Sequence, residues 1–411
     1  MGAAKARKGK VASEQVSWPA GFACGAAACG LKAAGKLDVA VLVAGQAVPA
    51  AAMFTTNLVQ AAPILVSREH LKRSKGLVRA VVVNAGNANA CTGQQGLRDA
   101  REMCEQVAKA VGCPREQVMV ASTGVIGRIM DMTKVRRGIR GALKDLGGTA
   151  DHFERFSAAI CTTDRWPKVA SATVALEAGQ TFRITGTTKG AGMIGPKMAT
   201  TLTFLATDAK VGVSSLRESL RHAIEASYNR SMVDGHMSTN DFALLMANGT
   251  SGTRVTGEET LAEFESALST VCLDLASQIV RDGEGATKRI ELVINGARND
   301  EVAEAIARTI AMSALVRTAI FGNDPNWGRI VSAVGYAPGV RDISRLRCKI
   351  QDTLVYRDGT PTKFDAAKLS NAMKAERVTI EVELGEGRGQ AFLQASDLTH
   401  DYVTINADYT T

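Results

Sequence analysis

The sequence predicts an α/β protein made of packed layers. Short apolar runs rich in β-branched residues, punctuated by glycine and proline, alternate with stretches of helical periodicity. Of the 411 residues, 45% are apolar and 22% are charged, which is ordinary for a globular chain of two or three domains with a sizeable core. Aromatic residues make up only 5% while alanine and glycine are plentiful, so we expect closely packed layers of small side chains.

The first half of the chain should begin with strands and then alternate. Four β-like runs are expected between residues 38 and 83, namely DVAVLVA, AAAMFTTN, PILVS and VRAVVVNAG. The elements expected after them are helix 97–111, strand 117–121, helices 133–146 and 152–160, and strands 169–176 and 181–188.

The second half should alternate in the same way. The elements expected there are strand 201–206, a helix capped by Ser214 or Ser215 that ends near Asn229, strand 242–247, helix 257–281, strand 290–294 and helix 301–320. A loop over 322–329 and several β runs then lead to a terminus that we expect to be pinned inside the structure. This last third indicates a smaller C-terminal α/β domain over residues 288–411.

Charge and cysteine content exclude several classes of protein. The net charge is +8, but much of it lies in a tail over residues 1–16 that we expect to be disordered, and no basic patch is interleaved with aromatics, so nucleic acid is not an expected partner. The eight cysteines are scattered without a completed zinc pattern, so we expect no metal, and buried free thiols in a reducing cytoplasm. The apolar run 39–54 is broken by Gly45, Gln46 and Pro49, and no signal peptide precedes the basic start, so no membrane is expected.

The chain is organised around residues 189–209, which read KGAGMIGPKMATTLTFLATDA. Its glycines match G-x-G-x-x-G. The dinucleotide fingerprint, however, needs a helix to begin inside the motif, whereas Pro196 and strand-forming residues follow here. We therefore expect no nucleotide cofactor at this turn.

A threonine nucleophile is the alternative chemistry for this stretch. A threonine hydroxyl needs an adjacent base, and none of the five histidines lies here. An N-terminal threonine carries its own base, because an α-amine with a pKa of about 7.7–8.0 is partly neutral at physiological pH. Self-cleavage between Ala199 and Thr200, through an N-to-O acyl shift and hydrolysis of the ester, would create such a residue. A glycine turn leading into an ordinary core strand is the simpler explanation of these residues alone.

Three further loops combine glycine with polar groups. The amide-rich loop 84–90 is either a tight strand-to-helix connection or part of a site. Thr123 and Gly124 can hold a developing oxyanion through a hydroxyl and a backbone N–H, or they simply end a strand. Glu284 lies between two glycines, where it is either a solvated loop charge or the partner of a substrate ammonium.

The stretch 189–209 resembles the self-processing segment of the ornithine acetyltransferases, the bifunctional glutamate N-acetyltransferase (amino-acid acetyltransferase) family of arginine biosynthesis. Other phrases resemble that family in the same order, from about residue 17 to residue 411: NAGNANACTG, STGVIG, TTD, MSTND, DGEGATK, NDPNWGRI and YVTINADYTT. The resemblance implies an α+β layered sandwich of the self-cleaving threonine-nucleophile acetyltransferase type. It implies an alpha chain over 17–199 and a beta chain over 200–411, in which 200–287 completes the catalytic core and 288–411 closes the site.

The resemblance also implies the chemistry and its residues. Thr200 would be the nucleophile after cleavage from Ala199, with Thr123 and Gly124 as the oxyanion hole. The implied substrate contacts are Thr163, Lys189, Thr200, Glu284, Asn406 and Thr411. The implied reaction passes acetyl from N-acetyl-L-ornithine to L-glutamate through an acetyl-Thr200 ester. No cofactor is implied, although some members also use acetyl-CoA as a co-substrate. The two chains of that family stay associated and usually assemble further, so we expect α2β2 or higher for this protein, in the cytoplasm.

Three departures from the family pattern bear on processing and on the choice of acyl donor. Lys197 stands where the family usually has asparagine, His236-Met237 replaces the usual Asp-Thr, and residues 129–132 differ from the common Leu-Pro-Met. His236 is interpreted as a satisfied structural histidine rather than a base. A second function stays open, because the same self-cleaved threonine would make an amidase or aminopeptidase if water discharged the acyl group. A basic binding protein with an intact chain is the non-enzymatic alternative.

Overall fold

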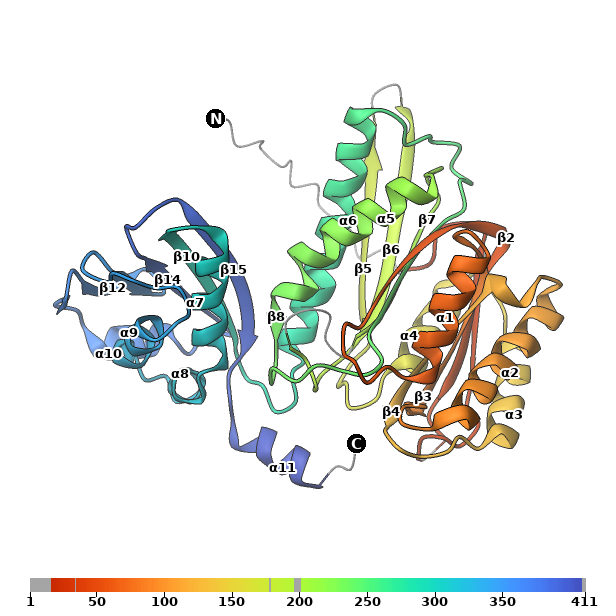
Figure 1. Cartoon of the computed structure of the whole chain (residues 1–411), viewed down its shortest axis with the longest axis horizontal. Helices are drawn as coiled ribbons and strands as arrows, with labels where there is room; N and C mark the ends of the chain where they lie inside the picture. Colours follow the sequence, from red (N-terminus) through yellow and green to blue (C-terminus); the bar gives the residue numbers. More distant parts are fainter. Residues whose placement is uncertain (1–15, 34, 177–178, 196–200, 409–411) are drawn as a thin grey trace.

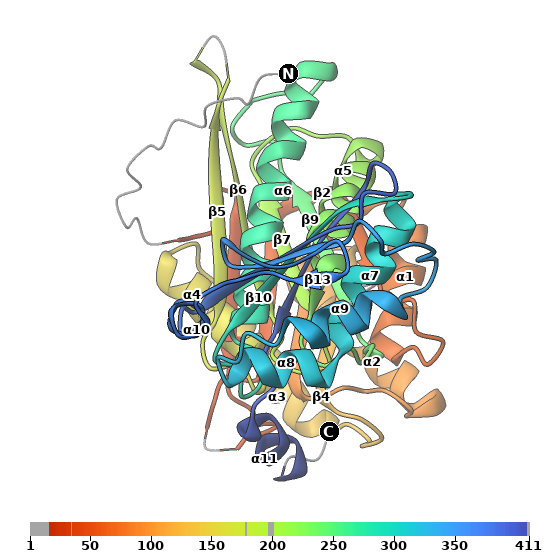
Figure 2. The ribbon, with the colours of Figure 1, turned by 90° about the vertical axis from the view of Figure 1, so that its left-hand side faces the viewer.

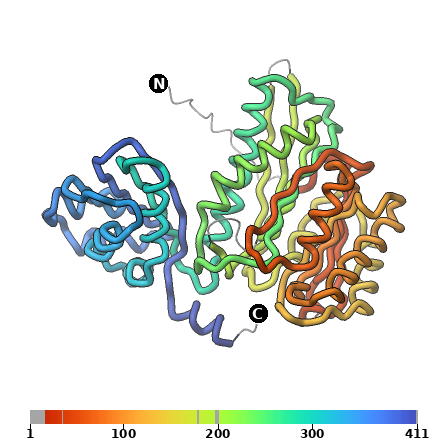
Figure 3. The backbone as a smooth tube through the Cα atoms, viewed as in Figure 1, coloured from red at the N-terminus to blue at the C-terminus, as the bar shows by residue number. Residues whose placement is uncertain are grey.

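The computed structural model of the chain describes residues 16–33, 35–176, 179–195 and 201–408. The predicted cleavage residues Ala199 and Thr200, the terminal Thr411, the departure Lys197 and nearly all of the tail 1–16 lie outside the described residues. Figures 1 and 3 show two lobes of unequal size, with the last helix extending from the smaller lobe back toward the larger one.

An eight-stranded sheet forms the larger lobe, in the order β4-β3-β2-β9-β7-β6-β5 with β1 paired to β2. Its strands are β1 (Phe22–Ala27), β2 (Val39–Phe54), β3 (Leu77–Asn87), β4 (Val118–Val125), β5 (Lys168–Ala175), β6 (Thr181–Lys189), β7 (Leu202–Thr207) and β9 (Phe242–Ala247). The first part of β2 pairs with β3 and its last five residues pair with β9, so this one strand joins two halves of the sheet.

The helices of this lobe pack against the two halves of the sheet (Figures 1 and 2). They are α1 (Ala62–Arg73), α2 (Gly93–Val111), α3 (Met132–Lys144), α4 (Ala150–Ile160), α5 (Val213–Ala226) and α6 (Glu258–Arg281). The core between the halves combines Phe153 of α4, Val83 of β3 and Phe204 of β7. Helices α2 and α3 cover the outer face of one half, and α5 and α6 cover that of the other. This order of helix, sheet, sheet and helix confirms the predicted layered α/β sandwich.

The smaller lobe has a sheet and a core of its own. The strands in order are β13-β12-β11-β14-β10-β15-β8, namely β13 (Thr360–Pro361), β12 (Thr353–Arg357), β11 (Arg347–Ile350), β14 (Arg377–Glu383), β10 (Arg289–Ala297), β15 (Gly389–Ser396) and β8 (Ser231–Met232). The helices are α7 (Asp300–Met312), α8 (Ala314–Phe321), α9 (Trp327–Gly335), α10 (Ala366–Ala372) and α11 (His400–Asp408). Since β8 belongs to the segment before residue 287, the two lobes share this sheet. None of the described helices is long and apolar enough to cross a membrane.

Several elements differ from the sequence prediction. The run PILVS is not a strand but the start of α1, because Pro63 fits the first helical turn, where its missing N–H is not needed. Neither Ser214 nor Ser215 caps α5, which begins after Gly212 without a side-chain cap. The helix predicted over 301–320 is two helices, since Ser313 ends α7 and caps α8 by accepting from the Val316 N–H.

Three further differences concern the end of the chain, the predicted loop 322–329 and the cysteines. The closing YVTINAD is helix α11 rather than the end of a β run, and none of its residues is buried. Residues 327–329, predicted as loop, open α9. Cys91 is exposed, so the expectation of buried thiols fails there, whereas Cys24, Cys29, Cys104, Cys272 and Cys348 are buried free thiols.

Candidate active site

A pocket of about 310 Å³ opens where the ends of β4 and β6 meet the loops before β5 and after α6 and the helix α11. The predicted site residues on its wall are Thr123, Gly124, Thr163, Lys189, Glu284 and Asn406. The remaining predicted residues, Ala199, Thr200 and Thr411, lie outside the part of the chain that the structure describes. The fold thus gathers residues from five separate stretches of sequence around one pocket.

Thr123 and Gly124 lie at the end of β4, beside the parallel strand β3. Gly124 has a φ of +131°, and a Cβ at this position would come within 2.3 Å of the Gly86 carbonyl carbon, so only glycine fits. The Thr123 Oγ1 accepts a hydrogen bond of 3.2 Å from the Lys189 ammonium. Because an ammonium only donates, the Thr123 hydroxyl proton remains available for a second acceptor in the pocket.

The amide-rich loop 84–90 supports this turn from behind. Asn84 accepts a 2.6 Å hydrogen bond from the Ser122 hydroxyl. The Asn240 side-chain amide donates to the carbonyls of Ala88 and Ser122, at 2.7 and 2.8 Å. Ala88 itself lines the pocket. The loop is therefore both a tight connection and a part of the pocket wall, which joins the two alternatives left open by the sequence.

Glu284 faces the pocket from the loop after α6. Its Oε2 accepts a 2.9 Å hydrogen bond from the Asn406 amide of α11. A Cβ on Gly192 would lie 2.4 Å from the same Oε2, so glycine at 192 makes room for the carboxylate. Tyr402, one turn before Asn406, also lines the pocket, and burial with the nearby charges of Asp234 and Glu284 raises its pKa to about 12. Helix α11 thus supplies one wall of the site.

The loop that carries Asp234 and His236 borders the other side. Asp234 accepts hydrogen bonds from the backbone N–H groups of Met193 and Ile194, at 2.6 and 2.9 Å, and burial raises its pKa. Asp234 thereby holds the end of the glycine-rich turn that precedes the predicted cleavage site. His236 is exposed and lines the pocket, and no described residue bonds to its ring, which contradicts the interpretation as a satisfied structural histidine.

Comparison with known proteins decides the family. The family model described as ArgJ family matches residues 23–411. A relative named arginine biosynthesis bifunctional protein ArgJ, from Rhodopirellula baltica, is 44% identical over 397 residues, which cover 96% of each chain. The chain belongs to the ArgJ family. This membership confirms the resemblance drawn from the ordered phrases.

Other ArgJ relatives are similar at comparable identity. A mitochondrial arginine biosynthesis bifunctional protein ArgJ from Schizosaccharomyces japonicus is 40% identical, over 98% of this chain and 95% of the relative. Among solved structures, an ArgJ from Bacillus halodurans is 40% identical and covers 49% of this chain and 96% of that chain, with a TM-score of 0.48. An ornithine acetyltransferase from Mycobacterium tuberculosis, complexed with ornithine, is 35% identical over 43% of this chain and 92% of that chain, with a TM-score of 0.40.

Sequence reasoning missed two groups of buried charges beside the ArgJ pocket. One is Asp241, whose Oδ1 accepts a 3.1 Å hydrogen bond from the N–H of Thr201, the first described residue after the predicted nucleophile. Its Oδ2 has no hydrogen-bond partner among the described residues, and burial raises its pKa well above the usual range. The only signal in the sequence was its place in the MSTND phrase.

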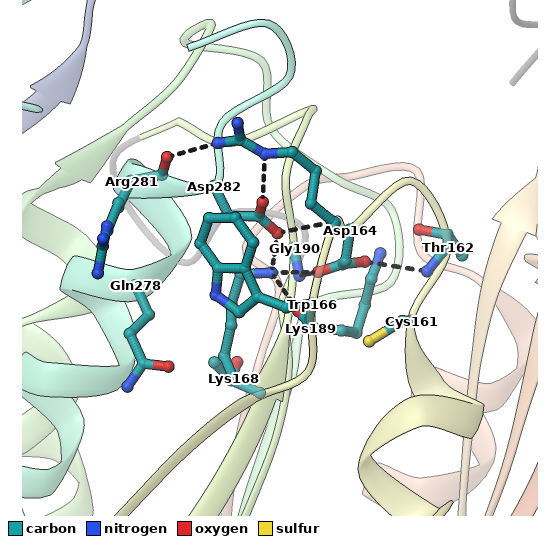
Figure 4. A network of polar contacts seen from close by, with 12 residues as sticks. Cys161, Thr162, Asp164, Trp166, Lys168, Lys189, Gly190, Gln278, Arg281 and Asp282 are labelled. Atoms are coloured by element: carbon teal, nitrogen blue, oxygen red, sulfur yellow. Dashed lines mark hydrogen bonds and ion pairs between the residues drawn. The ribbon is translucent and has the colours of Figure 1, made fainter. Parts of the chain in front are cut away.

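The second missed group is a network around Asp164, Lys168 and Asp282 (Figure 4). The Lys168 ammonium lies 2.6 Å from a carboxylate oxygen of each aspartate, and all three side chains are fully buried. Asp164 was visible in the TTD phrase of the ArgJ family, but nothing in the sequence connects it to Asp282, which is 118 positions further on.

Proposed function

We propose that this protein is an ornithine acetyltransferase that moves an acetyl group from N-acetyl-L-ornithine to L-glutamate. Membership of the ArgJ family over residues 23–411 makes it an acetyltransferase of arginine biosynthesis. The assignment as an ornithine acetyltransferase is supported by one observation in the pocket. There the ammonium of a buried lysine, Lys189, lies 3.2 Å from the hydroxyl of the predicted oxyanion residue Thr123.

The proposed nucleophile is Thr200 after cleavage from Ala199. Its hydroxyl would attack the Ala199 carbonyl, the peptide nitrogen would leave as the new α-amine, and water would hydrolyse the ester. An ordinary α-amine has a pKa of about 7.7–8.0, so the new amine would accept the proton of its own hydroxyl at neutral pH. The hydrogen bond from the Thr201 N–H to Asp241 supports this role, since it holds the residue that follows the nucleophile.

Acetyl transfer would follow in two steps. The Thr200 oxygen attacks the acetyl carbonyl, and the α-amine passes the hydroxyl proton to the departing nitrogen of ornithine. The amine of glutamate then attacks the acetyl-Thr200 ester, forms N-acetylglutamate and restores the hydroxyl. In both steps the carbonyl oxygen becomes negative, and the Thr123 hydroxyl with the Gly124 N–H would stabilise it.

The charges of the pocket suit an amino-acid substrate. In this proposal, Lys189 binds the carboxylate of N-acetylornithine and Glu284 binds its side-chain ammonium. Asn406 supports Glu284 through the 2.9 Å hydrogen bond, and Thr163 and the terminal Thr411 complete the contacts. Because opposite charges lie on separate segments of the wall, the substrate would be held at both ends.

Three further expectations belong to this proposal. No cofactor is required, whereas acetyl-CoA is a candidate second donor of the acetyl group. The alpha and beta chains would remain associated and assemble as α2β2 or higher. The enzyme would act in the cytoplasm, without nucleic acid or membrane as partner.

Mass spectrometry of the denatured protein and an acetyl-transfer assay test the proposal together. Two fragments that break between Ala199 and Thr200 are expected, and Thr200→Ala should stay intact and inactive. Cleaved protein should release ornithine from N-acetylornithine and form N-acetylglutamate when glutamate is present. Release of acetate that glutamate does not suppress would indicate the amidase instead. An intact chain with full activity would contradict the threonine mechanism.

A further inference from the structure

The buried network behind the pocket ties three segments of its wall together (Figure 4). At its centre, the Lys168 ammonium pairs with Asp164 Oδ1 and with Asp282 Oδ2, both at 2.6 Å. These three residues, called the triad below, do not line the pocket. Asp164 instead binds backbone groups at the edge of the pocket, and Asp282 lies two residues before the pocket residue Glu284.

Asp164 holds two of the segments. Its Oδ1 accepts a 2.7 Å hydrogen bond from the N–H of Gly190, the residue after Lys189. Its Oδ2 accepts a 2.9 Å hydrogen bond from the N–H of Thr162, the residue before Thr163. One carboxylate therefore fixes the end of β6 against the loop that precedes β5.

Asp282 holds the third segment, the loop after α6 that carries Glu284. Its carboxylate accepts from the Arg165 guanidinium at 2.8 Å and from the Arg165 backbone N–H at 3.1 Å. Two residues later, the Glu284 N–H donates to the Ala191 carbonyl at 2.8 Å. The position of Glu284 relative to β6 is thus set both through the triad and through this direct bond.

Electrostatics favour a triad that stays charged. Burial alone would raise the pKa of Asp164, but the charges of Lys168 and Lys189 and the hydrogen bonds hold it well below its usual range. Burial would likewise lower the pKa of Lys168, yet the two carboxylates outweigh it and raise the pKa. The Arg165 guanidinium, which stacks over the Trp166 ring at 4.8 Å, balances the second negative charge.

We propose that the triad determines substrate specificity by fixing the separation between Lys189 and Glu284. These two charges would bind the carboxylate and the side-chain ammonium of the substrate, so their separation selects amino acids by the number of methylenes between those groups. The inference rests on the proposed function, in which N-acetylornithine binds between them. The triad residues are positioning residues, since they act through the backbone of their neighbours and touch no substrate.

A competition assay measures this effect directly. N-acetylornithine is mixed with its homologues one methylene shorter and one methylene longer, and the ratio of kcat/KM values is read from the released amines. A ratio from competition does not depend on how much of the protein is cleaved. One methylene is typically worth about 10- to 200-fold in such discrimination. In wild type, we expect N-acetylornithine to be preferred over both homologues by a factor in this range.

Asp164→Asn is the main variant. The amide keeps the shape of the side chain, but its nitrogen donates instead of accepting, so one of the two backbone N–H groups loses its acceptor. Lys168 keeps Asp282 as a charged partner. We expect the preference to fall by about tenfold or more, because the wall segments lose their fixed spacing. Asp145→Asn is the matched control. Asp145 also pairs with an arginine, Arg155, at 2.7 Å and accepts a backbone N–H at 3.0 Å, but away from the pocket. The Asp145→Asn variant should prefer N-acetylornithine over the two homologues by the same factor as wild type.

The outcomes separate the two hypotheses. Wild-type protein that transfers no acetyl from N-acetylornithine would overturn the proposed function itself. Active wild type with an unchanged preference in cleaved Asp164→Asn would overturn the triad inference alone. If Asp164→Asn does not fold, Arg165→Met replaces it, because half of that arginine side chain is exposed and its loss should be tolerated. The preference should then fall by about two- to fivefold, and an unchanged value would again reject the inference.

Discussion

Replacing Thr123 with alanine should lower kcat for acetyl transfer by about 10²- to 10³-fold. The structure offers two donors for the developing oxyanion, and the variant keeps only the Gly124 N–H. Loss of one such donor typically costs about 2.7–4 kcal/mol of transition-state stabilisation. Substrate binding should change much less, because the Lys189 ammonium loses only a neutral acceptor that lies 3.2 Å away.

Two matched variants isolate the hydroxyl. Thr123→Val keeps the shape of the side chain without the donor and should be as slow as the alanine variant. Thr123→Ser keeps the donor and should stay within about tenfold of wild type. Rates are measured under saturating N-acetylornithine and expressed per cleaved chain, with cleavage determined by mass spectrometry, because the same donor would also assist self-cleavage. Normal turnover in cleaved Thr123→Ala would refute the oxyanion assignment.

The remaining predictions concern binding, backbone strain and pH. Glu284→Gln should raise KM for N-acetylornithine by about tenfold or more, since a charged hydrogen bond is lost; an unchanged KM in steady-state kinetics would contradict this. Gly124→Ala should lower the free energy of unfolding in urea by about 1–3 kcal/mol or more, because of its φ of +131° and its contact with Gly86, whereas wild-type stability would show that β4 can shift. The pKa of Asp164 is depressed in the folded protein, so the stability that this group contributes is present above its unfolded pKa and is lost as the pH falls through its folded pKa. The pKa of Lys168 is raised, so the stability that it contributes is present below its unfolded pKa and is lost as the pH rises through its folded pKa. The difference in the free energy of unfolding in urea between wild type and Asp164→Asn should therefore be constant from about pH 5 to about pH 9. A steep change within that range would contradict the directions of these two pKa shifts.

The sequence predicted most helices and strands of the larger lobe, because the hydrophobic periodicity of a segment is a local signal. Strand 242–247 agrees with β9, and helix 97–111 lies within α2. The prediction failed where a short apolar run fits either state. In PILVS the β-branched residues favour a strand, but the proline suits a first helical turn and the run continues into polar residues with helical spacing. At the end of the chain, helix α11 is held by contacts such as that of Asn406 with Glu284, which no local pattern contains.

The prediction of the site succeeded for some residues and failed for others. Thr123, Lys189 and Glu284 were found because they lie in phrases that resemble the family, and the structure brings them to one pocket. The triad could not be found, because lysine and aspartate are normally exposed and sequence alone does not show that Lys168 is buried against a residue 114 positions away. Its energy depends on complete pairing in a dry interior, which is a property of the fold and not of any segment.

The position of β7 in the sheet bears on what self-cleavage would do to the protein. Strand β7 pairs with β6, which precedes the proposed cut, and with β9, which follows it. In this register Lys189 of β6 lies opposite Leu202, only two residues after the proposed N-terminal threonine. Strand β9 in turn pairs with β2, which would belong to the alpha chain after cleavage. The beta chain would thus remain bound on both sides by strands of the alpha chain, so cleavage could release a new α-amine without separating Lys189 from the nucleophile.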